Sequence, residues 1–222
     1  MCFSAEVSFG AAAVISTVGV VAYKKASPNS FRVIAMIPIL FGIHQFLEGL
    51  VWVFIESNAT ELLAFSKYSY LFFAWVIWPF YIPYANWKVE KIAIRKKILF
   101  GFMVIGLLLG VILLSTFFIF DITATVVDHS ILYEVPYQND YLWIIHSLYF
   151  AAVVLPNAIS STPKMWILAA LNIVLFTMGK VLLDGNVISV WCFFAAITSL
   201  FILYIIVYNR KLYLKAGLNH TA

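Results

Sequence analysis

Long apolar runs alternate with short polar segments along almost the whole chain. Each run is continuous and about 17 to 25 residues long, which suits a helix that crosses the roughly 30 Å apolar layer of a bilayer. A membrane β-barrel would instead need short strands of alternating polarity. The pattern predicts an all-α bundle of seven transmembrane helices, at about residues 7–23, 31–55, 68–86, 97–120, 140–160, 164–183 and 187–208.

The composition agrees with a membrane protein. Of the 222 residues, 64% are hydrophobic and 11% are charged, whereas soluble domains average roughly 45–50% and about 25%. The connections are too short for a second domain, so residues 1–222 are predicted to form one integral membrane domain. The opening MCFSAEVSFG lacks the basic stretch and cleavage site of a secretory signal, so the first run is expected to be retained as a span.

Basic residues are concentrated in alternate connections, which predicts the orientation. One side of the bundle receives 12 of the 14 basic residues, namely Lys24, Lys25, Arg32, Lys88, Lys91, Arg95, Lys96, Lys97, Lys164, Arg210, Lys211 and Lys215. Because such residues favour the cytoplasmic side, a multi-pass protein of the cell membrane is predicted, with its N-terminus outside and its C-terminus in the cytoplasm. The net charge of +4 then reflects orientation, and no nucleic-acid partner is expected.

Prolines and the longest connection lead to two further predictions. Pro79 and Pro83, in WPFYIP, lack a backbone N–H and are predicted to kink the cytoplasmic end of the third span. The segment 121–139 lies on the outer side and is expected to be a solvated loop. A segment that folds over the mouth of the bundle is the alternative.

The stretch FGIHQFLEGLVW, residues 41–52, places polar residues inside an apolar span. His44 and Glu48 lie one helical turn apart, and Trp52 lies one turn further. An ionisable group at the bilayer centre costs about 2.5–3.5 kcal/mol on insertion scales, so such groups usually face the bundle interior and find partners. A rise of about 1.5 Å per residue places further polar residues in or near the outer half of the membrane, namely Cys2, His146, Asn172, Lys180, Asp184, Ser189 and Cys192.

These residues predict an outward-facing polar pocket within the membrane. We expect His146 and Lys180 to compensate the polar pair on the second span, and Asp184 to pair with Lys180. The pocket would be lined by His44, Trp52, Asn172, Lys180, Asp184, Ser189 and Cys192. The alternative is a buried polar network that only fixes helix register and packing.

A zinc site is one candidate use of this pocket. Thiolate, imidazole and carboxylate are the usual zinc ligands, and here they would come from Cys2, His44, Glu48 and His146. Removal of Met1 would also give Cys2 a free amine beside its thiol. A disulfide between Cys2 and Cys192 on the oxidising side, or a pair of inert thiols, competes with this interpretation.

Four stretches carry a resemblance: MCFSAEVSF, IPILFGIHQFLEGLVW, WPFYIP and VISVWCFFAA. They are similar to a family of small bacterial and archaeal membrane proteins of unknown function, which implies seven spans and no particular activity. By topology alone the chain also resembles the seven-span metal hydrolases of the alkaline ceramidase and adiponectin-receptor superfamily. Their paired histidines in the last span are missing here, so that likeness concerns the fold only.

Three functions are compatible with the pattern. The favoured one is a protein that binds or senses a small or amphiphilic ligand among the membrane lipids. The second is an intramembrane hydrolase or transferase of lipid-like substrates, with Glu48 or His146 as general base and Cys2 as nucleophile. The third is a transporter, although neither an inverted repeat nor a pair of broken helices supports it. The ligand and the oligomeric state are not predicted.

Overall fold

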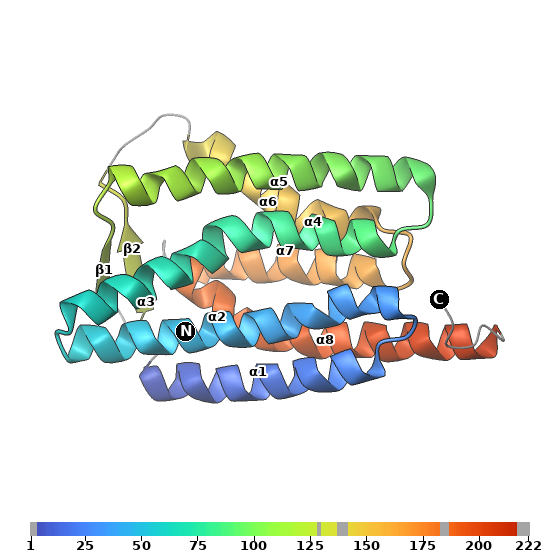
Figure 1. Ribbon diagram of the computed structural model, residues 1–222, viewed down its shortest axis with the longest axis horizontal. Helices are drawn as coiled ribbons and strands as arrows, with labels where there is room; N and C mark the ends of the chain where they lie inside the picture. The colour runs from blue at the N-terminus through green and yellow to red at the C-terminus, as the bar shows by residue number, and fades with distance from the viewer. Residues whose placement is uncertain (1–3, 128–129, 137–141, 183–186, 217–222) are drawn as a thin grey trace.

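Helices form almost all of the computed structural model, which describes residues 4–127, 130–136, 142–182 and 187–216 (Figure 1). The predicted spans each coincide with a helical segment, the third being divided into three pieces. The elements are α1 (Ala5–Lys25), η1 (Asn29–Phe31), α2 (Arg32–Glu56), α3 (Thr60–Phe72), η2 (Phe73–Ile77), α4 (Trp78–Val89), α5 (Ala93–Ile119), α6 (Leu142–Ile159), α7 (Met165–Leu182) and α8 (Val187–Lys215).

Four helical segments are long and apolar enough to cross a membrane. Within the described chain these are Ala5–Lys25, Asn29–Glu56, Ala93–Ile119 and Ala195–Lys215. The segments Trp143–Ile159 and Met165–Met178 are apolar but shorter. The helical part of the prediction is therefore confirmed, and the chain has the helices of a membrane protein.

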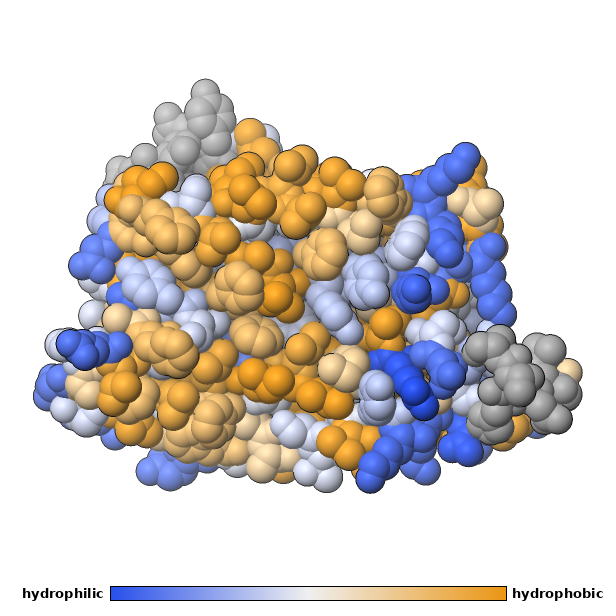
Figure 2. All heavy atoms as spheres, viewed as in Figure 1, coloured by the Kyte–Doolittle hydropathy of each residue, from blue (hydrophilic) through white to orange (hydrophobic). Residues whose placement is uncertain are grey.

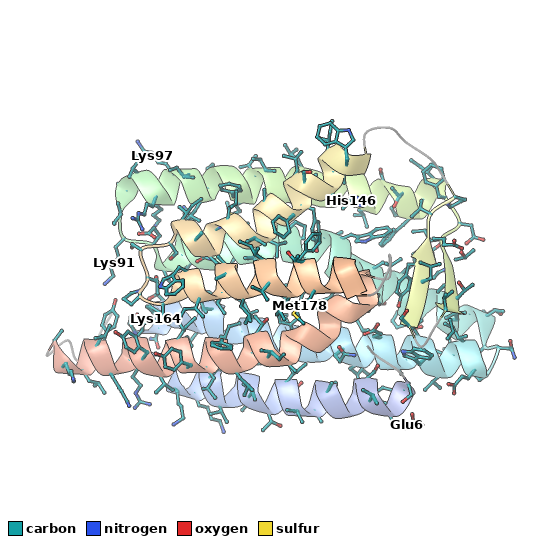
Figure 3. The ribbon with its side chains drawn as sticks, turned by 180° about the vertical axis from the view of Figure 1, so that it is seen from behind. Glu6, Lys91, Lys97, His146, Lys164 and Met178 are labelled. Carbon is teal, nitrogen blue, oxygen red and sulfur yellow. The ribbon has the colours of Figure 1, made fainter. Side chains whose placement is uncertain are left out.

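The helices lie side by side with their connections at two opposite ends (Figure 1). α1 packs against α2 and α8, α4 packs against α5 and α6, and α7 packs against α6 and α8. Figure 3 shows Lys91, Lys97 and Lys164 together at one end of the bundle, here called the basic end. The start of α1 with Glu6 lies at the other end, where the only strands of the described chain are found, and this is called the hairpin end.

A two-stranded antiparallel hairpin replaces the solvated loop expected at 121–139. β1 (Thr123–Val127) pairs with β2 (Ser130–Glu134), with Thr123 opposite Glu134 and Val127 opposite Ser130. Ile122, Ile131 and Tyr133 are buried and pack with Val51, Trp52, Tyr70 and Leu71 at the ends of α2 and α3. The expectation of a solvated loop was wrong because alternate residues of β2 bury apolar side chains against the helices.

The α3–η2–α4 run shows how prolines shape the third predicted span. The N–H of Trp78 bonds to the carbonyl of Phe73 in a π-helical turn, and Pro79 has no N–H to offer the preceding carbonyls. The Tyr149 hydroxyl of α6 instead donates to the Ala74 carbonyl. The irregular turn thus lies before Pro79, in the middle of the run, and not at the end where the kink was predicted.

Candidate functional site

Three polar side chains of α2 are buried together. Glu48 is 0% exposed, Gln45 is 1% exposed and His44 is 3% exposed, in a helix of 25 residues that is otherwise almost entirely apolar. The side-chain amide of Gln45 donates to Glu48 Oε2 at 3.0 Å. Sequence reasoning missed Gln45, although its i, i+3 spacing to Glu48 already placed the two on one helix face. We call His44, Gln45 and Glu48 the α2 cluster.

His44 is held by aromatic residues of the third helical run. The indole N–H of Trp78 donates to His44 Nδ1 at 3.2 Å, and because an indole nitrogen can only donate, Nδ1 carries no proton. The imidazole stacks on Tyr70, with ring centroids 4.3 Å apart. His146 was expected as the partner of this cluster, but His44 contacts Trp78, Tyr70 and Phe73.

His146 lies on the exposed side of α6, whose position Figure 3 shows. The neighbouring Trp143 and Leu148 are also exposed, whereas Ala152 and Val154 further along α6 are buried. The first half of α6 therefore presents these side chains outward. From its position in the sequence, His146 was expected at the same height in the bundle as the polar residues of α2. The rotation of α6 about its axis instead turns the His146 side chain away from the interior.

Several predicted site residues cannot be compared with the structure. Cys2 and Asp184 lie outside the described residues, as do the side chains of Lys180, Ser189 and Cys192. The Lys180–Asp184 ion pair and the Cys2–Cys192 disulfide therefore stay predictions. Among the side chains that are described, no three His, Cys, Asp or Glu residues come together as a metal site, so His44, Glu48 and His146 are not gathered around one ion.

A small cavity of about 20 Å³ lies among five helices. The cavity lies between His44 and the basic end of the bundle. Helix α2 runs from the basic end toward the hairpin end, and its two cavity residues, Ile37 and Phe41, come before His44. Trp78 connects the two features, since it lines the cavity and binds His44. The lining residues are Ile37 and Phe41 of α2, Trp78 and Ile82 of α4, Val153 and Asn157 of α6, Leu168 and Asn172 of α7, and Thr198 and Ile202 of α8.

Asn172 is thus a predicted pocket residue that the structure places beside a cavity. Another amide of the cavity wall, Asn157, is 3% exposed and accepts a hydrogen bond from Asn86 Nδ2 at 3.0 Å. Asn86 and Asn157 join α4 to α6 and were not singled out from the sequence. Both lie within apolar helices, and an asparagine in such a helix is the signal that could have found them.

The hairpin packs against Tyr70, the residue that stacks on His44 of the α2 cluster. Tyr133 of β2 stacks on Tyr70 with centroids 5.0 Å apart and an interplanar angle of 17°, and Tyr70 in turn stacks on His44. Trp52, another predicted pocket residue, is 4% exposed and packs in the same group. Lys67 donates to the carbonyl of Ile122 at the start of the hairpin. The three stacked rings therefore link the hairpin to the α2 cluster through Tyr70.

A second buried carboxyl, Glu90, lies at the basic end and ties two connections together. Its oxygens accept the backbone N–H groups of Ser161 at 2.6 Å, Lys91 at 2.9 Å and Ile92 at 2.8 Å, and also the Ser161 hydroxyl. Burial acts to raise the pKa of Glu90, but these hydrogen bonds together hold that pKa below its ordinary value. Glu90 was not singled out from the sequence, and its contacts give it a structural role.

Comparison with known proteins agrees with the resemblance noted above. Residues 1–216 match a protein family described as a family of unknown function, DUF6629. No curated protein and no solved structure matches the chain.

Proposed function

The chain belongs to this family of unknown function, and on that premise we propose that it is a membrane protein which binds or senses a small or amphiphilic ligand through the α2 cluster. The observation that carries the proposal is the complete burial of the Glu48 carboxyl, together with His44, in a helix long enough to cross a bilayer. Ionisable groups at such positions mark functional sites by default, because a purely apolar helix would insert at lower cost.

The surroundings of the α2 cluster favour ligand binding over simple packing. Toward the hairpin end, Tyr70 stacks on His44 and is itself covered by Tyr133, which belongs to the hairpin and not to a transmembrane helix. A ligand from the hairpin end would reach Glu48 once the Tyr70–Tyr133 stack separates.

The proposed topology has seven spans in the plasma membrane, with the hairpin outside and the basic end in the cytoplasm. Figure 2 shows a broad hydrophobic surface with hydrophilic residues gathered mainly toward one end. Basic side chains at that end lie over aromatic rings, as expected of residues at the level of the lipid headgroups. These pairs are Arg32 with Tyr23, Lys91 with Tyr213, Lys96 with Trp87, and Lys164 with Tyr208.

The geometry favours binding over the alternative of an intramembrane hydrolase. A hydrolase needs a general base beside a nucleophile or a metal-bound water. Glu48 is buried in the cluster, whereas His146 is exposed on α6. Of the two candidate general bases, Glu48 therefore lies in the α2 cluster and His146 does not, while the candidate nucleophile Cys2 lies outside the described residues.

The experiment is a ligand screen on matched carboxyl variants of α2. Wild type, Glu48→Gln and Glu56→Gln are purified in mild detergent, and thermal unfolding is recorded with a panel of single-chain lipids and small amphiphiles. Glu56 is exposed on the same helix and serves as the control. We expect at least one panel member to raise the unfolding temperature of wild type and Glu56→Gln but not of Glu48→Gln. Equal responses of all three folded proteins would overturn the proposal.

A further inference from the structure

The cavity on the basic-end side of His44 supports a binding site that does not depend on the proposed function. We infer that it is a hydration site for one water molecule, bound by the side chains of Asn157, Asn172 and Thr198. These residues come from α6, α7 and α8, so the water would join three helices in the interior of the bundle.

The volume fits a single water. A cavity needs roughly 10–15 Å³, measured as space for a water-sized probe, to hold one molecule, and this one measures about 20 Å³. The space is too small for an amphiphile, so the site is distinct from the ligand site proposed above.

The wall offers the polar partners that a buried water requires. Buried waters usually make two to four hydrogen bonds, and cavities that stay dry have apolar walls. Asn157 Oδ1 accepts from Asn86, and Asn157 Nδ2 donates to the Val153 carbonyl at 3.1 Å. One lone pair and one N–H of the Asn157 amide are left for a further partner. The Thr198 hydroxyl can both donate and accept.

Asn172 is half-buried and borders the cavity. Its amide can form up to four hydrogen bonds, yet within the described part of the chain its side chain makes none to protein. The part of the amide that is withdrawn from the surroundings is stabilised only by a partner that can bond to it. A water in the cavity supplies that partner, and it would lie between the His44–Trp78 bond and the Asn86–Asn157 bond.

The test is radiolytic hydroxyl-radical footprinting of the detergent-solubilised protein in ¹⁸O-labelled water, with oxidation located by mass spectrometry. Radicals generated from a bound water oxidise the side chains beside it. Phe41 and Trp78 line the cavity and are only 7% and 3% exposed. We expect both to be oxidised in wild type, and we expect Asn172→Leu, which removes the amide, to lower their oxidation at least fivefold.

Two further variants separate the water from a change in folding. Thr177→Val lies on the exposed face of α7, where the Thr177 hydroxyl bonds to its own helix, and it should leave the oxidation unchanged. Asn172→Ser keeps a polar group and adds space, so it should retain the oxidation of Phe41 and Trp78. Lack of oxidation of these two residues in wild type, or equal oxidation in folded Asn172→Leu, would overturn the inference.

Discussion

Gly106 lies at a close approach of α5 to α4, and its replacement by alanine tests this packing. A Cβ atom at residue 106 would lie 1.8 Å from the carbonyl oxygen of Pro79 and 2.5 Å from its carbonyl carbon. The α-helical donor to that carbonyl would be the N–H of residue 83, which is a proline. The missing bond leaves this face of α4 open to α5, and a glycine allows the two backbones to come into contact.

The cost of Gly106→Ala follows from the fact that both clashing atoms belong to the backbone. No rotamer change can relieve the contact, so α4 and α5 must separate until the distance to the Pro79 oxygen reaches at least 3.0 Å. Overpacking of a close interface costs about 1–3 kcal/mol, and we take about 3 kcal/mol because backbone must move. Alanine recovers about 1 kcal/mol through its helix propensity. The net loss of about 2 kcal/mol corresponds to roughly a thirtyfold lower ratio of folded to unfolded protein.

The assay is reversible unfolding in mixed detergent micelles, with Gly101→Ala as the matched control. Gly101 lies on the same helix, and nothing is within 4 Å of the Cβ position that alanine would add there. Gly101→Ala should therefore equal or exceed wild type in stability by up to about 1 kcal/mol. If Gly106→Ala unfolds at the same detergent fraction as Gly101→Ala, the close contact between α4 and α5 is refuted.

Three further predictions concern the two ends of the bundle. The pKa of Glu90 is lowered in the folded protein, so the stabilisation that its carboxylate gives is complete above its unfolded pKa of about 4.3 and is lost as the pH falls through the lower folded pKa. Wild type should therefore lose more stability between about pH 6 and pH 3 than Glu90→Gln. Parallel curves of stability against pH for the two proteins would contradict this. Tyr133→Ala should accelerate amide hydrogen exchange in β1 and β2 through loss of the stack on Tyr70, and the control Leu132→Ala should accelerate it less. Equal exchange rates in the two variants would show that the stack does not hold the hairpin. A fluorescent protein fused after residue 222 should fold and fluoresce in intact cells, since the C-terminus is predicted to be cytoplasmic, and a dark but expressed fusion would reverse the orientation.

The helices were predictable because each depends on a long local pattern. A continuous apolar run fixes both the helical state and the approximate ends, and α2 over Arg32–Glu56 matches its predicted span of 31–55 within one residue. The hairpin was missed because its strands have only five residues each, and their burial depends on packing against α2 and α3. Such contacts are formed between distant parts of the chain and leave little trace in the local sequence.

For the candidate site, the sequence predicts the height of each residue along its helix but not the direction in which its side chain points. Sequence position gives the height of a residue along a helix, at about 1.5 Å per residue, and it placed both His146 and Asn172 at plausible levels. Whether a side chain faces the interior depends on how its helix is rotated, which is set by packing. Asn172 borders the interior cavity, whereas His146 is exposed. The burial of Gln45 beside Glu48 depends on the same rotation, because an uncharged amide in an apolar run does not by itself indicate which way it faces.

The stack of His44, Tyr70 and Tyr133 gives these separate observations a common physical meaning. A carboxyl such as Glu48 is tolerated in an apolar helix only while its polar neighbours remain in place, since the hydrogen bond from Gln45 compensates part of the hydration that it loses. The rings of Tyr70 and Tyr133 enclose the adjacent His44. Tyr133 belongs to the hairpin, so a displacement of the hairpin would remove one layer of that enclosure. Under the proposed function we therefore expect the state of the α2 cluster and the position of the hairpin to be coupled, and a ligand that stabilises an open hairpin would also have to compensate Glu48.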